Sequence, residues 1–468
     1  GGRAGIRPPS CLAPYLMHAL GRLCSLLLGG LVGAASGGRD AGLDLGLSSH
    51  GPDECPGCAG PRGPALWESL LQTAVGVARG APPPRGGQLG ARHQQVLVNS
   101  GDIGYVGKVT VANQTLWGIM DTGSFDLVGF RKRDCRGCGP AASVLLCSAP
   151  SCTVGGGEEK CLEYGSGTTC GDRAAADVSI GPLTSSGQRF LLGHSANMPV
   201  MSTARFQAIV GLGVPQKGEL LPGLGARYFS VCLPSVDDGK IVWNDDAPGS
   251  GFAHLHVVAS RFWGVKMTGA HLKGPRGSRN VGCSPSCGAI LDTGTSLIGV
   301  PSSTFRLMSR GMAELGESCD KIDTLPSLHF RLGGEDFVLP PTAFVGYFTQ
   351  KTIPWLPSWL PQPVLLRCEL LMVDMGELQT SLGSAWILGM PFFRHYYTTF
   401  DLGARGGTDV NRMMVHTAPT GGSCVPGDVA REREQRLMTV DPHKLRMPRW
   451  VAGAAARPGA GNSTELLF

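Results

Sequence analysis

Charge is scarce in this 468-residue chain, because Asp, Glu, Lys and Arg together make up only 16% of it. Such a composition is not typical of a protein built from long helices, whose exposed faces carry many charged residues. The formal net charge of +5 is spread along the sequence without a basic stripe, so the pattern argues against nucleic-acid binding. The apolar run at residues 23–32 is too short and too rich in glycine to form a membrane anchor.

Zinc-binding patterns are also weak. Sixteen cysteines are present, but no repeated Cys-x2-Cys unit is combined with histidines at zinc spacing. One Cys-x2-Cys unit begins at Cys55 and another at Cys135, so zinc remains an alternative to disulfides there. The cysteine content favours an oxidising compartment. We expect no metal and no organic cofactor, and no histidine is assigned to chemistry.

Glycine and proline are abundant, with 70 and 34 residues respectively. Short apolar or alternating segments lie between turns rich in these residues, for example at 105–111, 176–180, 239–244 and 329–339. This pattern predicts a mostly β protein. A chain of this length can hold two lobes with large cores.

The tripeptide Asp-Thr-Gly occurs twice, beginning at Asp121 and at Asp292. Each copy follows a strand-like apolar run and precedes a hydroxyl residue, Ser124 or Thr295, and then another apolar stretch. A single copy is an ordinary turn sequence, but the repeated context predicts two carboxylates at the tips of two buried strands. Facing carboxylates cannot both be charged, so one keeps a proton and the other becomes a base able to activate water.

The remaining residues of each copy suit this chemistry. Thr122 and Thr293 carry short hydroxyls that can tie the two loops together through backbone hydrogen bonds. Gly123 and Gly294 allow a tight turn and leave N–H groups close to the carboxylates. The hydroxyl residue that follows each copy can donate to an outer carboxylate oxygen, which favours the charged form.

Further segments extend the pattern. Tyr-Gly-Ser-Gly at 164–167 can form a hairpin tip, and an apolar-apolar-Gly segment occurs in each half, at 209–211 and 387–389. Cys283 and Cys287 bracket a short loop just before the second copy. In order and spacing, these motifs resemble the pepsin-like aspartic proteases.

The resemblance covers residues 104–418 and implies a bilobal β fold with the active-site cleft between two related lobes. It implies that the two aspartates are the catalytic dyad and that Tyr164, Gly165 and Gly167 form a flap over the substrate. Four isoleucines stand where the family lines its side-chain pockets, although buried isoleucine is also ordinary core. They are Ile119, Ile209, Ile290 and Ile387.

The sequence departs from the family pattern at three positions. Val128 replaces a Trp that bonds to the flap tyrosine, and Asp126 replaces an Asn, so flap positioning is in question. Met390 stands where many members with an acid optimum carry Asp, which predicts a mildly acidic optimum. The cysteine-rich segment 135–170 resembles the plasmepsins and toxomepsins of parasites.

Disulfides follow from the same resemblance. It implies the pairs Cys283–Cys287 and Cys319–Cys368. The six cysteines between 135 and 170 are expected to pair among themselves, in a pattern that sequence alone leaves open. Cys232 with Cys424 is a further expected pair.

The predicted organisation has five parts. They are a signal peptide at 1–35, with Met17 as an alternative start, a leader at 36–100, an N-terminal lobe at 101–234, a C-terminal lobe at 235–418 and a tail at 419–468. The leader is interpreted as a propeptide or as a disordered segment. The Trp- and Pro-rich segment 353–363 is either a packed loop or an exposed apolar patch.

These patterns predict an aspartic endopeptidase that binds a peptide or protein substrate. We expect a monomer of the secretory pathway, either secreted or held in an acidic vesicle, without a transmembrane helix. Glycosylation sequons at Asn113 and Asn462 fit that location. The alternative is a catalytically silent relative that binds peptides, since a misplaced flap costs catalysis more than binding.

Overall fold

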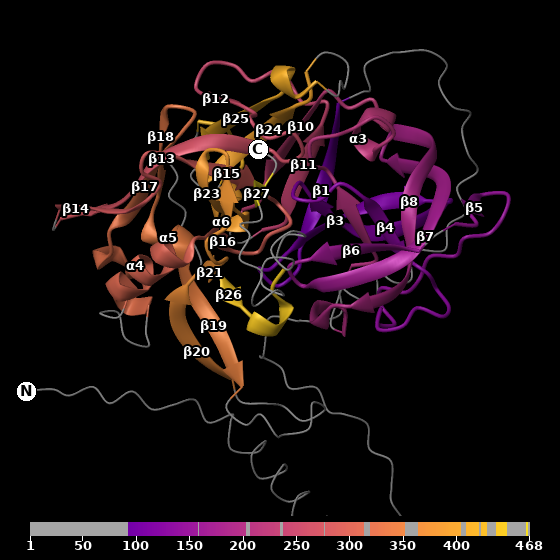
Figure 1. Cartoon of the computed structure of the whole chain (residues 1–468), viewed down its shortest axis with the longest axis horizontal. Helices are drawn as coiled ribbons and strands as arrows, with labels where there is room; N and C mark the ends of the chain where they lie inside the picture. The colour runs from indigo at the N-terminus through magenta and orange to yellow at the C-terminus, as the bar shows by residue number, and fades with distance from the viewer. Residues whose placement is uncertain are drawn as a thin grey trace, which may run out of the picture. The chain divides into compact units, whose positions relative to one another are not determined.

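The computed structural model describes residues 92–446 except 158, 203–205, 235–236, 276, 313–318, 352–363, 404–408, 421–422 and 428–436, and also describes residues 465–466. The predicted signal peptide, the leader up to residue 91 and the Trp- and Pro-rich segment lie outside the described residues. Strands dominate the described part (Figure 1), and this confirms the mostly β fold class.

The first half contains ten strands and two short helices within the described residues. They are β1 (His93–Asn99), β2 (Tyr105–Val111), β3 (Gln114–Asp121), β4 (Leu127–Phe130), β5 (Cys152–Val154), β6 (Lys160–Tyr164), β7 (Gly167–Ile180), β8 (Leu183–Asn197), η1 (Pro199–Ser202), β9 (Ala208–Gly211), α3 (Leu220–Gly223) and β10 (Tyr228–Cys232).

The second half has more helices and a longer series of strands. It runs through β11 (Gly239–Trp243), β12 (Ala253–His256), β13 (Gly264–Gly274), β14 (Gly277–Gly282), β15 (Cys287–Leu291), β16 (Ile298–Val300), α4 (Ser302–Met312), η2 (Cys319–Thr324), β17 (Ser327–Leu332), β18 (Glu335–Leu339), α5 (Pro341–Phe344), β19 (Val345–Lys351), β20 (Val364–Leu370), β21 (Met372–Asp374), β22 (Gln379–Thr380), β23 (Gly383–Leu388), α6 (Met390–Phe393), β24 (Tyr396–Asp401), η3 (Val410–Arg412), β25 (Met414–Pro419), β26 (Thr439–Val440), η4 (Pro442–Lys444) and β27 (Glu465–Leu466).

The same four-strand arrangement occurs in both halves. In the first, β3 pairs with β9 in parallel, β9 with β4 antiparallel, and β4 with β8 in parallel. In the second, β15, β23, β16 and β21 pair in the same way. β9 and β15 are buried along their whole length, as expected for parallel strands covered on both faces.

A shared sheet joins the halves. In its order, β24 and β25 of the second half lie next to β10 of the first half, and β11 of the second half lies between β10 and β1 of the first half. Its core is aromatic, with Phe229 stacked on Phe400 at 4.7 Å between ring centroids. Residues His93–Asn99, which fall within the predicted leader, form β1, which pairs with β11 and β2.

The C-terminal segment also contributes strands. β26, which lies in the region predicted as a tail, pairs with β19 in parallel (Figure 1). Met438 and Val440 are buried in the main hydrophobic core. β27 pairs with β22. Part of the region beyond residue 419 is therefore packed on the second half.

Six disulfides connect the described residues. They are Cys135–Cys138, Cys147–Cys152, Cys161–Cys170, Cys232–Cys424, Cys283–Cys287 and Cys319–Cys368. Disulfides at this density are typical of proteins that fold in the secretory pathway. None of the helices in the described residues is long and apolar enough to span a membrane.

Candidate active site

The two aspartates occupy equivalent positions in the repeated strands. Asp121 is the last residue of β3, and Asp292 directly follows the last residue of β15. Both are buried, with relative exposures of 5% and 0%. The backbone N–H of Asp292 donates to the carbonyl of Leu388 at the end of β23. On the other side, the carbonyl of Asp121 accepts from the N–H of Leu212, just after β9.

Matching donors hold the two carboxylates. Asp121 accepts from the N–H of Gly123 at 3.0 Å and from the hydroxyl of Ser124 at 2.8 Å. Asp292 accepts from the N–H two residues further on at 2.7 Å and from the hydroxyl of Thr295 at 2.6 Å. Each carboxylate is thus fixed through both of its oxygens by its own loop.

Glycine is required in each loop by the carboxylate of the other loop. A Cβ placed on Gly123 would overlap the carboxyl group of Asp292, and one on Gly294 would overlap that of Asp121. Neither glycine has a positive φ. The sequence predicts that these glycines allow a tight turn. In the structure, the absence of a side chain at each glycine makes room for the carboxyl group of the opposite aspartate.

The two threonines interlock the loops. The N–H of Thr122 donates to the hydroxyl of Thr293 at 3.1 Å, and the N–H of Thr293 donates to the hydroxyl of Thr122 at 2.9 Å. Each hydroxyl also donates across the junction, to the carbonyl of Leu291 or of Met120, at 2.9 and 2.7 Å. These reciprocal bonds fix the separation of the two carboxylates.

Burial and a neighbouring charge set the protonation of the pair. The pKa of Asp292 is raised to about 7, first because burial disfavours the charged form and then because Asp121 lies beside it. Hydrogen bonds from Thr295 and Gly294 oppose this rise. Burial and the facing carboxylate thus both favour the protonated form of Asp292.

The flap residues lie on a hairpin. Tyr164 ends β6 and pairs with Gly167, which begins β7, so Gly165 is in the connecting turn. Tyr164 is only 2% exposed and belongs to the hydrophobic cluster that contains Val128 and Phe206. Val128, which replaces the Trp of the family pattern, thus packs in the same cluster as the flap tyrosine.

The four isoleucines lie in the strands behind the loops. Ile119 faces Ile209 in the β3–β9 register, and Ile290 faces Ile387 in the β15–β23 register. All four are at most 2% exposed. The first pair shares the cluster of Tyr164.

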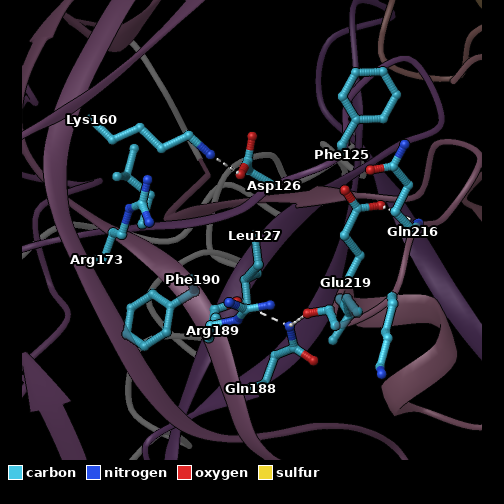
Figure 2. A pocket seen from close by; sticks show the side chains of 14 residues that line it. Phe125, Asp126, Leu127, Lys160, Arg173, Gln188, Arg189, Phe190, Gln216 and Glu219 are labelled. Atoms are coloured by element: carbon cyan, nitrogen blue, oxygen red, sulfur yellow. Dashed lines mark hydrogen bonds and ion pairs between the residues drawn. The ribbon is translucent and has the colours of Figure 1, made fainter. Parts of the chain in front are cut away.

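A pocket of about 260 Å³ lies beside the first loop (Figure 2). Phe125, which contributes to it, packs against Phe262 at 5.2 Å between centroids. At the pocket's edge, Lys160 Nζ pairs with Asp126 at 2.6 Å, and this contact ties the start of the flap strand β6 to the first loop. The pocket is lined by Phe125, Asp126, Leu127, Lys160, Arg173, Gln188, Arg189, Phe190, Leu191, Gln216, Lys217, Gly218, Glu219 and Leu220.

Arg446 lies beside the dyad, although nothing in the sequence indicated a functional residue at this position. Its guanidinium lies 3.8 Å from Asp121 Oδ2 and is buried. Burial lowers the pKa of Arg446, while Asp121 and Asp292 act in the opposite direction. No local motif marks this arginine, because only the fold brings residue 446 to the first loop.

One group of metal-ligating residue types lies close together in the described part of the chain, namely Glu159, Cys161 and Cys170. The two cysteines are bonded to each other, so the group offers a single carboxylate. Cys135 and Cys138 likewise form a disulfide, while Cys55 and Cys58 lie outside the described residues.

A family model and several known proteins match this chain. The family model described as eukaryotic aspartyl protease matches residues 104–220 and 224–406. Renin-2 of Mus musculus is 27% identical over 339 residues, which cover 65% of this chain and 79% of the relative. Pepsin A of Rhinolophus ferrumequinum is 27% identical over 347 residues, covering 66% and 81%.

Cathepsin E of Rattus norvegicus is a third relative, 27% identical over 339 residues that cover 66% of this chain and 79% of the relative. The resemblance found in the sequence is thereby confirmed at the level of the family, and the likeness to the parasite branch stays a prediction. The family match covers more than half of the chain and spans both Asp-Thr-Gly loops. The chain therefore belongs to the eukaryotic aspartyl protease family and is a pepsin-like aspartic endopeptidase.

Proposed function

We propose that Asp121 and Asp292 hydrolyse peptide bonds by activating one water molecule between their carboxylates. The observation that carries this proposal is the facing geometry, in which each glycine makes room for the opposite carboxyl group. Ser124 and Thr295 hold the two carboxyl groups by matching hydrogen bonds. Positioning of this kind supplies much of the rate enhancement in reactions of bound groups.

In the first step of the reaction, two protons move: one leaves the water molecule and the other leaves the protonated carboxyl group of the pair. The ionised carboxylate takes a proton from the water, whose oxygen then bonds to the scissile carbonyl carbon. The protonated carboxyl gives its proton to the carbonyl oxygen, which forms a gem-diol. The dyad then gives the proton taken from the water to the nitrogen, while one diol hydroxyl returns its proton to the other carboxylate. The C–N bond breaks, the amine and the carboxylic acid leave, and the pair again holds one proton. The pKa of about 7 for Asp292 supports a singly protonated pair at acidic pH.

The substrate in this proposal is an extended peptide held beneath the flap. Tyr164 with Gly165 and Gly167 would close over it, and backbone groups would grip it like an added strand. The four buried isoleucines would form the apolar floor of the side-chain pockets. The hairpin of β6 and β7 and the ion pair of Lys160 with Asp126 support a positioned flap.

We further infer secretion or residence in an acidic vesicle, with a mildly acidic optimum and a monomeric state. The disulfides support an oxidising route. Asn113, the acceptor of a glycosylation sequon, is exposed in the turn between β2 and β3. The propeptide role predicted for residues 36–100, with a disordered leader as the alternative, belongs to the same proposal.

A transition-state analogue gives the test. The full chain is incubated with a peptide pool from about pH 3 to about pH 7, with and without a statine-type peptide, whose hydroxyl mimics the gem-diol. We expect cleavage that the analogue blocks and that Asp292→Asn abolishes. Analogue binding without cleavage would instead identify the silent peptide-binding relative, and cleavage retained in Asp292→Asn would exclude the dyad.

A further inference from the structure

The segment of residues 437–446 returns from the second half to the catalytic dyad. Its first part is anchored by apolar side chains, since Met438 and Val440 are 2% and 0% exposed. The carbonyl of Met438 accepts from the N–H of Tyr347 at 2.8 Å in the pairing of β26 with β19. This part of the segment is therefore a fixed component of the fold.

A buried ion pair holds the segment further along. The N–H of Thr439 donates to the carboxylate of Asp102 at 3.3 Å. Asp102 also pairs with Arg394 at 3.3 Å, and both side chains are less than 5% exposed. Because Asp102 precedes β2 and Arg394 follows α6, the segment is attached to both halves of the molecule.

The end of the segment is fixed beside the second loop. Ser296, the residue after Thr295, donates its N–H to the carbonyl of Arg446 at 3.2 Å. In return, the N–H of Arg446 donates to the hydroxyl of Ser296 at 3.1 Å, and that hydroxyl donates to the carbonyl of Ile103 at 2.6 Å. The backbone of Arg446 is thus positioned independently of its side chain.

From that position the side chain reaches the first loop. The guanidinium lies 3.8 Å from Asp121 Oδ2 and 5.4 Å from the ring centroid of Phe206, and the side chain is 7% exposed. Nη1 is buried without a hydrogen-bond partner among the described residues. In the described part of the chain, the Arg446 guanidinium forms an ion pair with the catalytic carboxylate of Asp121.

We propose that residues 437–446 form a tethered inhibitor in which Arg446 is the counter-ion of the dyad, a proposal that rests on the proposed function. A guanidinium at this distance favours the charged form of a carboxylate. It therefore pairs with the ionised carboxylate that takes the proton of the water, and its side chain competes with a substrate for the space next to Asp121. The inhibitory segment belongs to the same chain and follows both catalytic halves in the sequence.

The test compares full-length variants that keep the backbone anchors. Arg446→Gln removes the charge, and Lys444→Gln is the matched control, because the ion pair of Lys444 among the described residues is with Asp441, at 3.2 Å. Arg446→Lys keeps the charge. Ser296→Ala, which removes one anchor of the segment, is the second test if Arg446→Gln does not fold. Each variant is measured for peptide turnover and for the Kd of a fluorescent statine-type peptide.

We expect Arg446→Gln to bind the statine-type peptide about tenfold more tightly than the wild type, which corresponds to about 1.4 kcal/mol. Its kcat/KM should rise in parallel, Ser296→Ala should show a smaller rise, and Arg446→Lys and Lys444→Gln should resemble the wild type. Tighter binding without turnover in any variant would support the inhibitor and overturn the proposed hydrolysis. Unchanged affinity in both Arg446→Gln and Ser296→Ala would overturn the inhibitor.

Discussion

The two Asp-Thr-Gly loops share their internal hydrogen bonds and differ in their surroundings. Each carboxylate accepts one backbone N–H and one hydroxyl from its own loop. Asp121, however, faces the guanidinium of Arg446, whereas Asp292 is fully buried and shows a raised pKa. The repeated residues position both carboxylates, and Arg446, which lies outside the repeat, places a positive charge beside Asp121.

Replacement of either aspartate tests the shared part of this comparison. Asp121→Asn and Asp292→Asn should each lower kcat by at least about 10⁴-fold. When two residues act as one catalytic unit, removal of either abolishes nearly all of the catalysis that the pair provides. Turnover of a peptide substrate checks this, and circular dichroism verifies that the variants fold. Substantial activity in one variant alone would break the equivalence of the two loops.

The glycines test the facing geometry. Gly123→Ala and Gly294→Ala each place a methyl group where the opposite carboxyl group lies, so the dyad must separate. A displacement of about 1 Å costs on the order of 10²-fold in rate, and we expect a loss of that size in kcat. Gly249→Ala is the matched control, since open space surrounds that position and its φ is not positive. Equal effects in all three variants would contradict the geometric explanation.

The Tm values of the two aspartate variants should differ, although both variants are expected to lose activity. The folded pKa of Asp292, about 7, lies above its ordinary value of 3.8, so the folded state binds more protons than the unfolded chain between these pH values. The contribution of Asp292 to stability is therefore present at low pH and is lost as the pH rises toward about 7. Asp292→Asn removes this dependence, and its Tm relative to the wild type should rise across that range by a few degrees.

Asp121→Asn should act in the opposite direction. It leaves the buried guanidinium of Arg446 without its counter-charge, and such a loss costs about 1–3 kcal/mol. Thermal unfolding at neutral pH should give a lower Tm for this variant than for Asp292→Asn. The double variant Asp121→Asn with Arg446→Gln should recover part of the loss. A similar Tm for both single variants would show that the loops have equivalent electrostatic surroundings.

Met390 provides a smaller test, of the surroundings of the second loop. It is fully buried at the start of α6, and its N–H donates to the carbonyl of Thr295 at 2.9 Å. A carboxyl group introduced by Met390→Asp would stay protonated at acidic pH because burial disfavours its charge. Its O–H could then donate near the dyad and favour the ionised dyad. We expect the pH–rate profile to move toward acid by about half a pH unit.

Met390→Leu, which keeps the size and adds no polar group, is the control for that shift. The unmutated enzyme should have its pH optimum above about pH 4, because Met390 stands where an acidic side chain would lie next to the second loop. An optimum well below that value, or an unshifted profile in Met390→Asp, would show that Met390 does not set the pH dependence.

Sequence reasoning predicted the parts of the molecule that rest on local pattern. The apolar runs before Asp121 and Asp292 predicted two buried strands, and the structure places both aspartates at strand ends. Glycine and proline before His93 favour a leader there, and the segment HQQVLVN lacks an alternation of apolar and polar residues, although the structure buries Gln95 and Leu97 on one face of a strand. The glycine and proline content of residues 36–100 as a whole therefore gave no indication of the seven-residue strand near their end.

The position of Arg446 could not have been predicted from the sequence. Its contact with Asp121 joins residues that are far apart in the chain, and the two-residue strand β26 before it is too short to give a periodic signal. Val128 was identified as a departure at the flap, but its packing in the cluster of Tyr164 depends on side-chain volumes that only the fold reveals.

The flap supplies the last and smallest test of how the first loop differs from the second. Lys160 begins β6 and pairs with Asp126 at 2.6 Å, four residues before Tyr164 at the end of the same strand. The two side chains are 37% and 24% exposed, and a partly exposed pair of this kind contributes about 0.2–1 kcal/mol. Lys160→Gln should therefore raise KM by about two- to fivefold with little change in kcat, because the flap is positioned less well while the dyad is intact.

High salt should raise the KM of the wild type toward that of Lys160→Gln, because the ion pair is screened. Lys217→Gln makes the same change of charge beside the same pocket, at a lysine for which the described residues provide no ion pair. If Lys217→Gln raised KM as much as Lys160→Gln, the charge of the pocket would explain the effect. A rise confined to Lys160→Gln would show that an ion pair stabilises the flap where Val128 cannot donate a hydrogen bond, on the side of the first loop.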